Sequence, residues 1–147
     1  MVKRIRHPGI VVGDLEKSLH FWSDLLGFKV VREMDEHGPH MDRMLGIENV
    51  RVKTVKMIAD EGGSMLELLA FQSPGPVRGQ PPAINTIGLT HVAIEVDDAE
   101  ETFRRLASAG AKFNSPPQLS PDGFSKVAFC RDPDGTFVEI IQRGLTK

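Results

Sequence analysis

The chain has little cysteine, no excess of basic charge and no long apolar run. Its single cysteine, Cys130, cannot form an internal disulfide, which favours the cytosol as the compartment. The formal net charge of −2, without a basic stripe or tail, argues against nucleic-acid or membrane-surface binding. No apolar stretch approaches the roughly 20 residues of a membrane span. The start of the sequence also lacks the apolar core and cleavage site of a signal peptide. We therefore expect a cytoplasmic protein without nucleic-acid or membrane partners.

The remaining composition is that of an ordinary globular protein. Hydrophobic residues make up 40% and charged residues 26% of the 147 positions. A chain of this length suits one domain, residues 1–147, with a core of its own.

One pattern occurs twice: a histidine, an alternating apolar segment and an acidic helix start. The first copy is HPGIVVGDLEKSLHFW (residues 7–22), and the second is HVAIEVDDAEETFRRL (residues 91–106). They align without a gap and match His7 with His91, Ile10 with Ile94, Val12 with Val96, and Asp14 with Asp98. The alternation predicts a strand with two different faces in each copy.

A helix should follow each of these strands. Asp98 stands three residues before Glu101, a capping-box arrangement, and Asp14 occupies the same place in the first copy. Gly27 and Gly110 are placed to end the two helices. The expected apolar positions are Leu15, Leu19, Trp22 and Leu26 in the first helix, and Phe103 and Leu106 in the second.

The later parts of the two copies also match. GGSMLELL (residues 62–69) aligns with DGTFVEII (residues 134–141), which pairs Glu67 with Glu139. Each segment is predicted to be the second arm of a hairpin, with turns at residues 60–63 and 132–135. The fold class is therefore α+β, with two βαβββ modules. Module one is expected at residues 1–72, a Pro- and Gly-rich linker at 73–84 and module two at 85–147.

Two histidines and two glutamates thus occupy equivalent positions. If the modules pack around an approximate two-fold axis, His7, Glu67, His91 and Glu139 meet in one cleft. Both glutamates are flanked by apolar residues, where an ionised carboxylate is costly unless a cation compensates it. A single strand histidine is more often structural than a ligand. Four repeat-equivalent residues instead favour a mixed N/O site for one divalent transition metal: Zn, Ni, Co, Mn or Fe.

Four stretches together resemble the vicinal oxygen chelate superfamily: HPGIVVGDLEKSLHFWSDLLGF, GSMLELLAF, GLTHVAIEVDD and DPDGTFVEII. This superfamily includes glyoxalase I, methylmalonyl-CoA epimerase, extradiol dioxygenases and bleomycin-resistance proteins. The resemblance implies two βαβββ modules around a metal-binding cleft, usually in a homodimer. By position, His7, Glu67, His91 and Glu139 match the metal ligands of glyoxalase I. Some epimerases have glutamine at the position of Glu67.

The resemblance also implies a chemistry. A metal-dependent lyase or isomerase of the glyoxalase I or epimerase type removes a proton next to a carbonyl and stabilises the enediolate with the metal. Its substrate would be a small oxo, hydroxy or acyl-thioester compound. The family assigns the role of base to the position of Glu139. Glu67 would be a ligand and a second base on the other face.

Three other functions stay open. A dioxygenase would use His7, His91 and Glu139 around Fe(II), which leaves Glu67 as a surplus ligand. A thiol transferase of the fosfomycin-resistance kind also needs only three ligands. A bleomycin-resistance-type binding protein would be no enzyme and would need no metal.

Substrate recognition is not evident from the sequence. No set of glutathione-binding residues can be transferred from the family. Arg51, Lys53 or Lys56 could bind CoA phosphates, but we interpret them as the solvated edge of a strand. The insert at residues 36–49 is expected to form a short apolar helix or flap, which would carry His37 and His40.

Overall fold

The computed structural model describes residues 1–145 and divides the chain into two compact units, Met1–Gly79 and Gln80–Lys147. The last two positions expected in module two, residues 146 and 147, lie outside the described residues. None of the helices within the described part is long and apolar enough to cross a bilayer.

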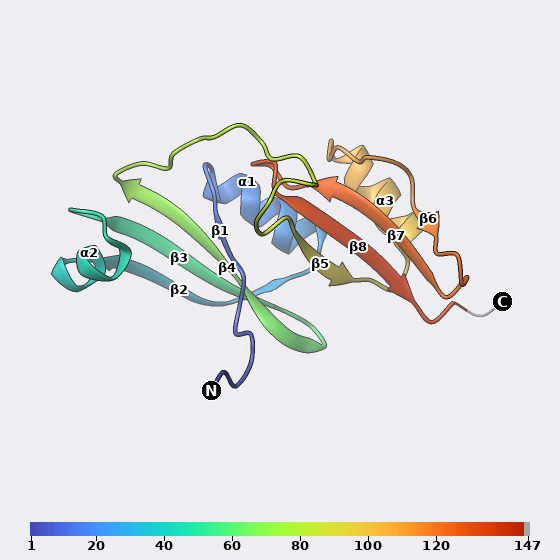
Figure 1. Cartoon of the computed structure of the whole chain (residues 1–147), viewed down its shortest axis with the longest axis horizontal. Helices are drawn as coiled ribbons and strands as arrows, with labels where there is room; N and C mark the ends of the chain where they lie inside the picture. The colour runs from blue at the N-terminus through green and yellow to red at the C-terminus, as the bar shows by residue number, and fades with distance from the viewer. Residues whose placement is uncertain (146–147) are drawn as a thin grey trace. The chain divides into compact units, whose positions relative to one another are not determined.

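The first unit holds one four-stranded sheet in the order β1-β4-β3-β2 (Figure 1). β1 runs parallel to β4, and the other neighbours are antiparallel. Its elements are β1 (Gly9–Val11), α1 (Leu15–Leu19), the π-helix η1 (His20–Leu25), β2 (Lys29–His37), α2 (Pro39–Leu45), β3 (Arg51–Ala59) and β4 (Gly62–Ser73).

The second unit repeats this topology with the order β5-β8-β7-β6. Its elements are β5 (His91–Glu95), α3 (Ala99–Ser108), β6 (Gln118–Leu119), β7 (Ser125–Arg131) and β8 (Phe137–Arg143). Again the first strand is parallel to the last, and α3 lies along β7 and β8 (Figure 1). The predicted α+β fold of two βαβββ modules is confirmed.

The two predicted helix starts are also confirmed. A carboxylate oxygen of Asp14 accepts a hydrogen bond from the backbone N–H of Lys17 at 3.1 Å, and Asp98 accepts one from Glu101 at 3.0 Å. These bonds stabilise the ionised carboxylates, so they hold the pKa of Asp14 and of Asp98 below the usual value. Each aspartate therefore fixes the point where its module turns from the first strand into the helix.

The first helix differs from the expected regular α-helix. Five α-helical residues are followed by the six-residue π-helix η1, whose wider turns change the buried face. Consequently Phe21 and Trp22 are both buried, whereas the other positions of the expected stripe are only half-buried. Trp22 packs edge-to-face against Phe21 and Phe28, with ring centroids 5.3 and 5.7 Å apart.

The insert forms the predicted short helix, α2, which lies beside β2 (Figure 1). Its Met41 belongs to a small apolar cluster with Val50 and Val52, against which Leu69 of β4 also packs. His40 lies on α2, but the expectation for His37 is wrong: it is the last residue of β2, because the strand continues further than expected.

Cys130 lies in the core of the second unit and is fully buried. Burial away from water penalises the thiolate and raises the pKa of this thiol to about 12. In this environment Cys130 is a small core residue and is not available as a nucleophile.

The folded protein should therefore be nearly inert toward thiol reagents. At about pH 8 we expect no measurable release of thionitrobenzoate from Ellman's reagent within minutes, because the thiolate is the reacting form. The same protein in denaturant should release one equivalent. Rapid stoichiometric release under native conditions would show that Cys130 is accessible.

Candidate functional site

The strand register places one histidine and one glutamate together in each unit. Gly9 of β1 lies opposite Glu67 of β4, and Ala93 of β5 lies opposite Glu139 of β8. Each histidine stands two residues before this position, His7 just ahead of β1 and His91 at the first residue of β5. The equivalence seen in the sequence repeat is thus an equivalence of register.

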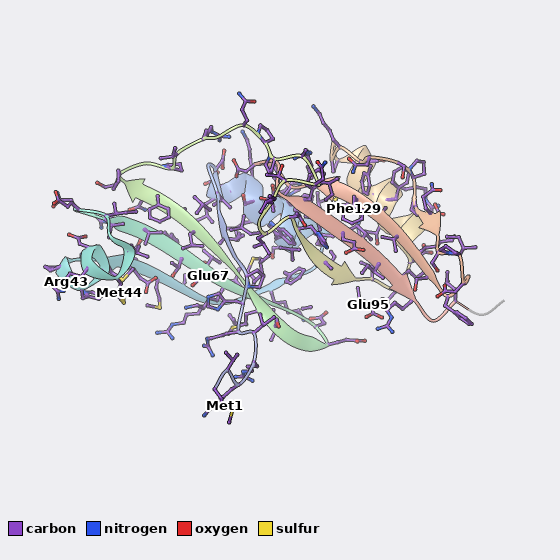
Figure 2. All side chains as sticks on the ribbon, in the orientation of Figure 1. Met1, Arg43, Met44, Glu67, Glu95 and Phe129 are labelled. Carbon is purple, nitrogen blue, oxygen red and sulfur yellow. The ribbon has the colours of Figure 1, made fainter. Side chains whose placement is uncertain are left out.

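The two pairs have the same geometry. His7 Nε2 is 3.0 Å from Glu67 Oε2, and His91 Nε2 is 3.0 Å from Glu139 Oε2. All four side chains are partly buried, with exposed fractions of 24% and 13% in the first pair and 34% and 19% in the second. Figure 2 shows Glu67 on its strand, β4. In each unit, one imidazole nitrogen and one carboxylate oxygen therefore lie side by side.

These atoms suit a divalent transition metal in type and spacing. Two donors that each lie about 2.1 Å from one ion are about 3.0 Å apart at the 90° angle of octahedral coordination and about 3.4 Å apart at the tetrahedral angle. The His–Glu separation of 3.0 Å in each pair is that of a hydrogen bond, and it is close to these values. Within residues 1–145, no group of three or more His, Cys, Asp or Glu side chains is arranged to hold an ion. The donors fit a metal, but each unit provides only two of the four.

The surroundings of the two glutamates differ. Lys56 of β3 is the cross-strand neighbour of Glu67, and its Nζ lies 3.2 Å from Oε1. The corresponding neighbour of Glu139 is Phe129 of β7, labelled in Figure 2. Glu67 therefore contacts a cation through one oxygen and His7 through the other. Among the described residues, Glu139 contacts His91 through Oε2 and lies beside an aromatic ring.

The interpretation of Lys56 as part of a solvated strand edge is wrong. β3 is an inner strand, and the side chain of Lys56 is only 18% exposed because it lies across from Glu67. Both faces of β3 are covered: the buried Val52 and Thr54 lie on the same side of the sheet as Lys56, and the buried Val55 and Met57 lie on the other side. What the sequence did not provide was the register that sets Lys56 against Glu67.

The histidines also differ in their second ring nitrogen. His91 Nδ1 is 2.7 Å from the hydroxyl oxygen of Thr90, and the ring meets Phe129 edge-on at 5.3 Å between centroids. His7 Nδ1 is buried and has no hydrogen-bond partner among the described residues. Since a hydroxyl can donate or accept, Thr90 can hold the His91 ring whether or not Nε2 carries a proton.

The remaining histidines lie apart from these pairs. His20 is exposed and bonds through Nδ1 to Asp24 at 2.8 Å on the next turn. His37 and His40 are exposed, and neither belongs to a group of residues arranged to hold a metal.

The chain is similar to known proteins over most of its length. The model of the Glyoxalase/Bleomycin resistance protein/Dioxygenase superfamily matches residues 4–140. A lactoylglutathione lyase of Neisseria meningitidis is 30% identical over 141 residues, which covers 95% of this chain and 91% of that protein. A probable lactoylglutathione lyase of Vibrio cholerae is 28% identical over 148 residues, covering 95% of this chain and 90% of that one.

The fold is also found among solved structures. A glyoxalase family protein from Bacillus cereus aligns with a TM-score of 0.89 at 20% identity, covering 99% of this chain and 97% of that one. At this identity the likeness concerns the fold alone. The two relatives are a lactoylglutathione lyase and a probable lactoylglutathione lyase, so the expectation of an enzyme similar to lactoylglutathione lyase is confirmed.

The contact between Thr90 and His91 generates a prediction. Thr90→Val keeps the shape but removes the hydroxyl that orients the imidazole. Loss of such a support costs about 10- to 100-fold in metal affinity, so we expect weaker zinc binding, measured by competition with a chromophoric chelator. Thr90→Ser should bind zinc nearly as the unmodified protein does. Equal affinities in all three proteins would remove Thr90 from the site.

Proposed function

The chain belongs to the glyoxalase/bleomycin resistance protein/dioxygenase superfamily, and we propose that it is a divalent-metal-dependent lyase of the lactoylglutathione lyase type. Membership confirms the resemblance carried by the four sequence stretches. The proposal depends chiefly on one observation, the same His–Glu geometry in both modules.

In this proposal the two pairs bind one ion, and each module contributes two ligands. His7 and Glu67 come from the first module, and His91 and Glu139 come from the second. The two pairs that share the ion come from one chain or from two chains of a dimer. The candidate ions are Zn, Ni, Co, Mn and Fe, which accept mixed nitrogen and oxygen ligands. When bound, the ion would supply Lewis acidity to a carbonyl oxygen of the substrate.

The substrate chemistry follows from the names of the relatives. S-lactoylglutathione is a 2-hydroxy thioester, and it is an isomer of the hemithioacetal that glutathione forms with 2-oxopropanal. Conversion between these isomers removes a proton from one carbon and returns a proton to its neighbour. The reaction therefore needs one positioned base, and carboxylates serve in this role.

Glu139 is the better placed of the two glutamates to be this base. Glu67 has both oxygens engaged, one by His7 and the other by Lys56. In the described structure Glu139 contacts His91 through Oε2, and its Oε1 has no charged partner. One oxygen of Glu139 can therefore take the substrate proton and later return it, while Glu67 serves as a ligand.

Metal binding is the first test. Purified protein loaded with zinc and freed of excess ion should hold about one ion per pair of modules, measured by elemental analysis. His7→Ala or His91→Ala should each lower the affinity at least about tenfold, because a direct ligand is lost. His20→Ala, an exposed histidine elsewhere, is the matched control. If the protein binds none of the divalent ions tested, the proposal is refuted and a bleomycin-resistance-type binding function is favoured.

The second test concerns the base. Glu139→Gln keeps the shape and an oxygen ligand but cannot take a proton. We expect incorporation of solvent deuterium into the product from the hemithioacetal to slow by at least about a hundredfold. Glu67→Gln should be milder, and the metal content of both variants must be measured. Unchanged incorporation in metal-loaded Glu139→Gln would assign the base elsewhere, and oxygen-dependent turnover of catechols would indicate a dioxygenase.

A further inference from the structure

Lys56 stands in a row of charged residues that crosses three strands of the first unit. Its cross-strand neighbours are Glu67 on β4 and Arg32 on β2. Paired residues of adjacent strands point to the same side of a sheet, so all three side chains share the face that carries the His7–Glu67 pair. On this face Lys56 is the partly buried cation beside Glu67, whereas Arg32 is exposed. A second carboxylate on the same face, that of Glu36 on β2, accepts a hydrogen bond from Thr54.

Among the described residues, only Glu67 forms an ion pair with Lys56. A divalent ion bound by two glutamates and two neutral histidines is a neutral set that already uses the charge of Glu67. When Glu67 serves as a metal ligand, its charge therefore balances Lys56 less completely. A partly buried ammonium without a full counter-charge is costly, so a further anion beside Lys56 is favoured.

Lys56 also has free bonding capacity. An ammonium carries three N–H donors, and the contact with Glu67 Oε1 occupies one of them. With 18% of its side chain exposed, Lys56 is accessible to a small ligand but sufficiently shielded for a charge-assisted hydrogen bond to be strong. The second module has Phe129 at the equivalent position, so this feature belongs to the first module alone.

We propose that Lys56 is a substrate-binding residue that donates a hydrogen bond to a negatively charged oxygen of the substrate beside Glu67. This inference rests on the proposed function, because it takes the His7–Glu67 pair as part of the reaction site. The oxygen comes either from a carboxylate already present in the substrate or from the enediolate formed when the proton leaves. Either source places an anion next to the Lys56 ammonium.

The first experiment uses two small ligands of matched shape. Lactate and lactamide both carry a hydroxyl beside a carbonyl carbon, but only lactate is charged. Their binding to the zinc-loaded protein is measured by calorimetry for the unmodified chain, Lys56→Met and Lys56→Arg. We expect Lys56→Met to weaken lactate binding about tenfold or more, as for one charge-assisted bond, and to leave lactamide nearly unchanged. Lys56→Arg should retain most of the preference for lactate.

Lys53→Met is the matched control. Lys53 lies on the same strand but on the opposite face, where it pairs with Glu33 at 2.7 Å. Its replacement removes the same charge from β3 without touching the row of Lys56. We expect the preference for lactate to remain unchanged in this variant.

A second measurement separates the two sources of the anion. If Lys56 acts on the enediolate, Lys56→Met should lower kcat for the hemithioacetal with little change in KM. If it binds a carboxylate of the substrate, the loss should appear in lactate binding. A Lys56→Met protein that binds zinc and matches the unmodified chain in both measurements overturns the inference and leaves the proposed function intact. Failure of the unmodified protein to bind any metal would overturn both.

Discussion

The parallel pairing of the first strand with the last strand of each module determines the rest of the site. Only this pairing sets a residue near the start of the module against one near its end, with His7 close to Glu67 and His91 close to Glu139. A parallel neighbour requires a crossover, which the helix after the first strand provides. The capping aspartate and the helix therefore contribute to the site indirectly. They carry the chain from the first strand of the sheet to its opposite edge, from which the last two strands lead back to the first.

Much of this arrangement was accessible from the sequence because it is periodic. The alternating strands, the caps at Asp14 and Asp98 and the turns before Glu67 and Glu139 each depend on a few neighbouring residues. The histidines and glutamates were identified because the repeat doubled every signal. The π-helix η1 was not predicted, since the spacing of apolar residues in this segment is also that of a regular α-helix.

The role of Lys56 was missed for a different reason. A lysine on a strand is predicted to be solvent-exposed unless the residues opposite it on the neighbouring strands are known. This register depends on pairs of strands and not on one segment of the sequence. The sequence repeat gives no indication of Lys56 either, because the repeat is defined by matching residues and this position does not match between the modules. Lys56 and Phe129 are equivalent in the fold but unlike in chemistry, as are Arg6 and Thr90 beside the two histidines. The two modules thus share a scaffold while their sites have become specialised.

The burial of Cys130 has a consequence for an enzyme of the proposed kind. Glutathione and its adducts are thiol compounds, and thiol–disulfide exchange requires an accessible thiolate on the protein. The only thiol in the sequence is enclosed in the core of the second unit, where its thiolate form is strongly disfavoured. The folded chain can therefore work among thiols at high concentration without forming mixed disulfides through Cys130.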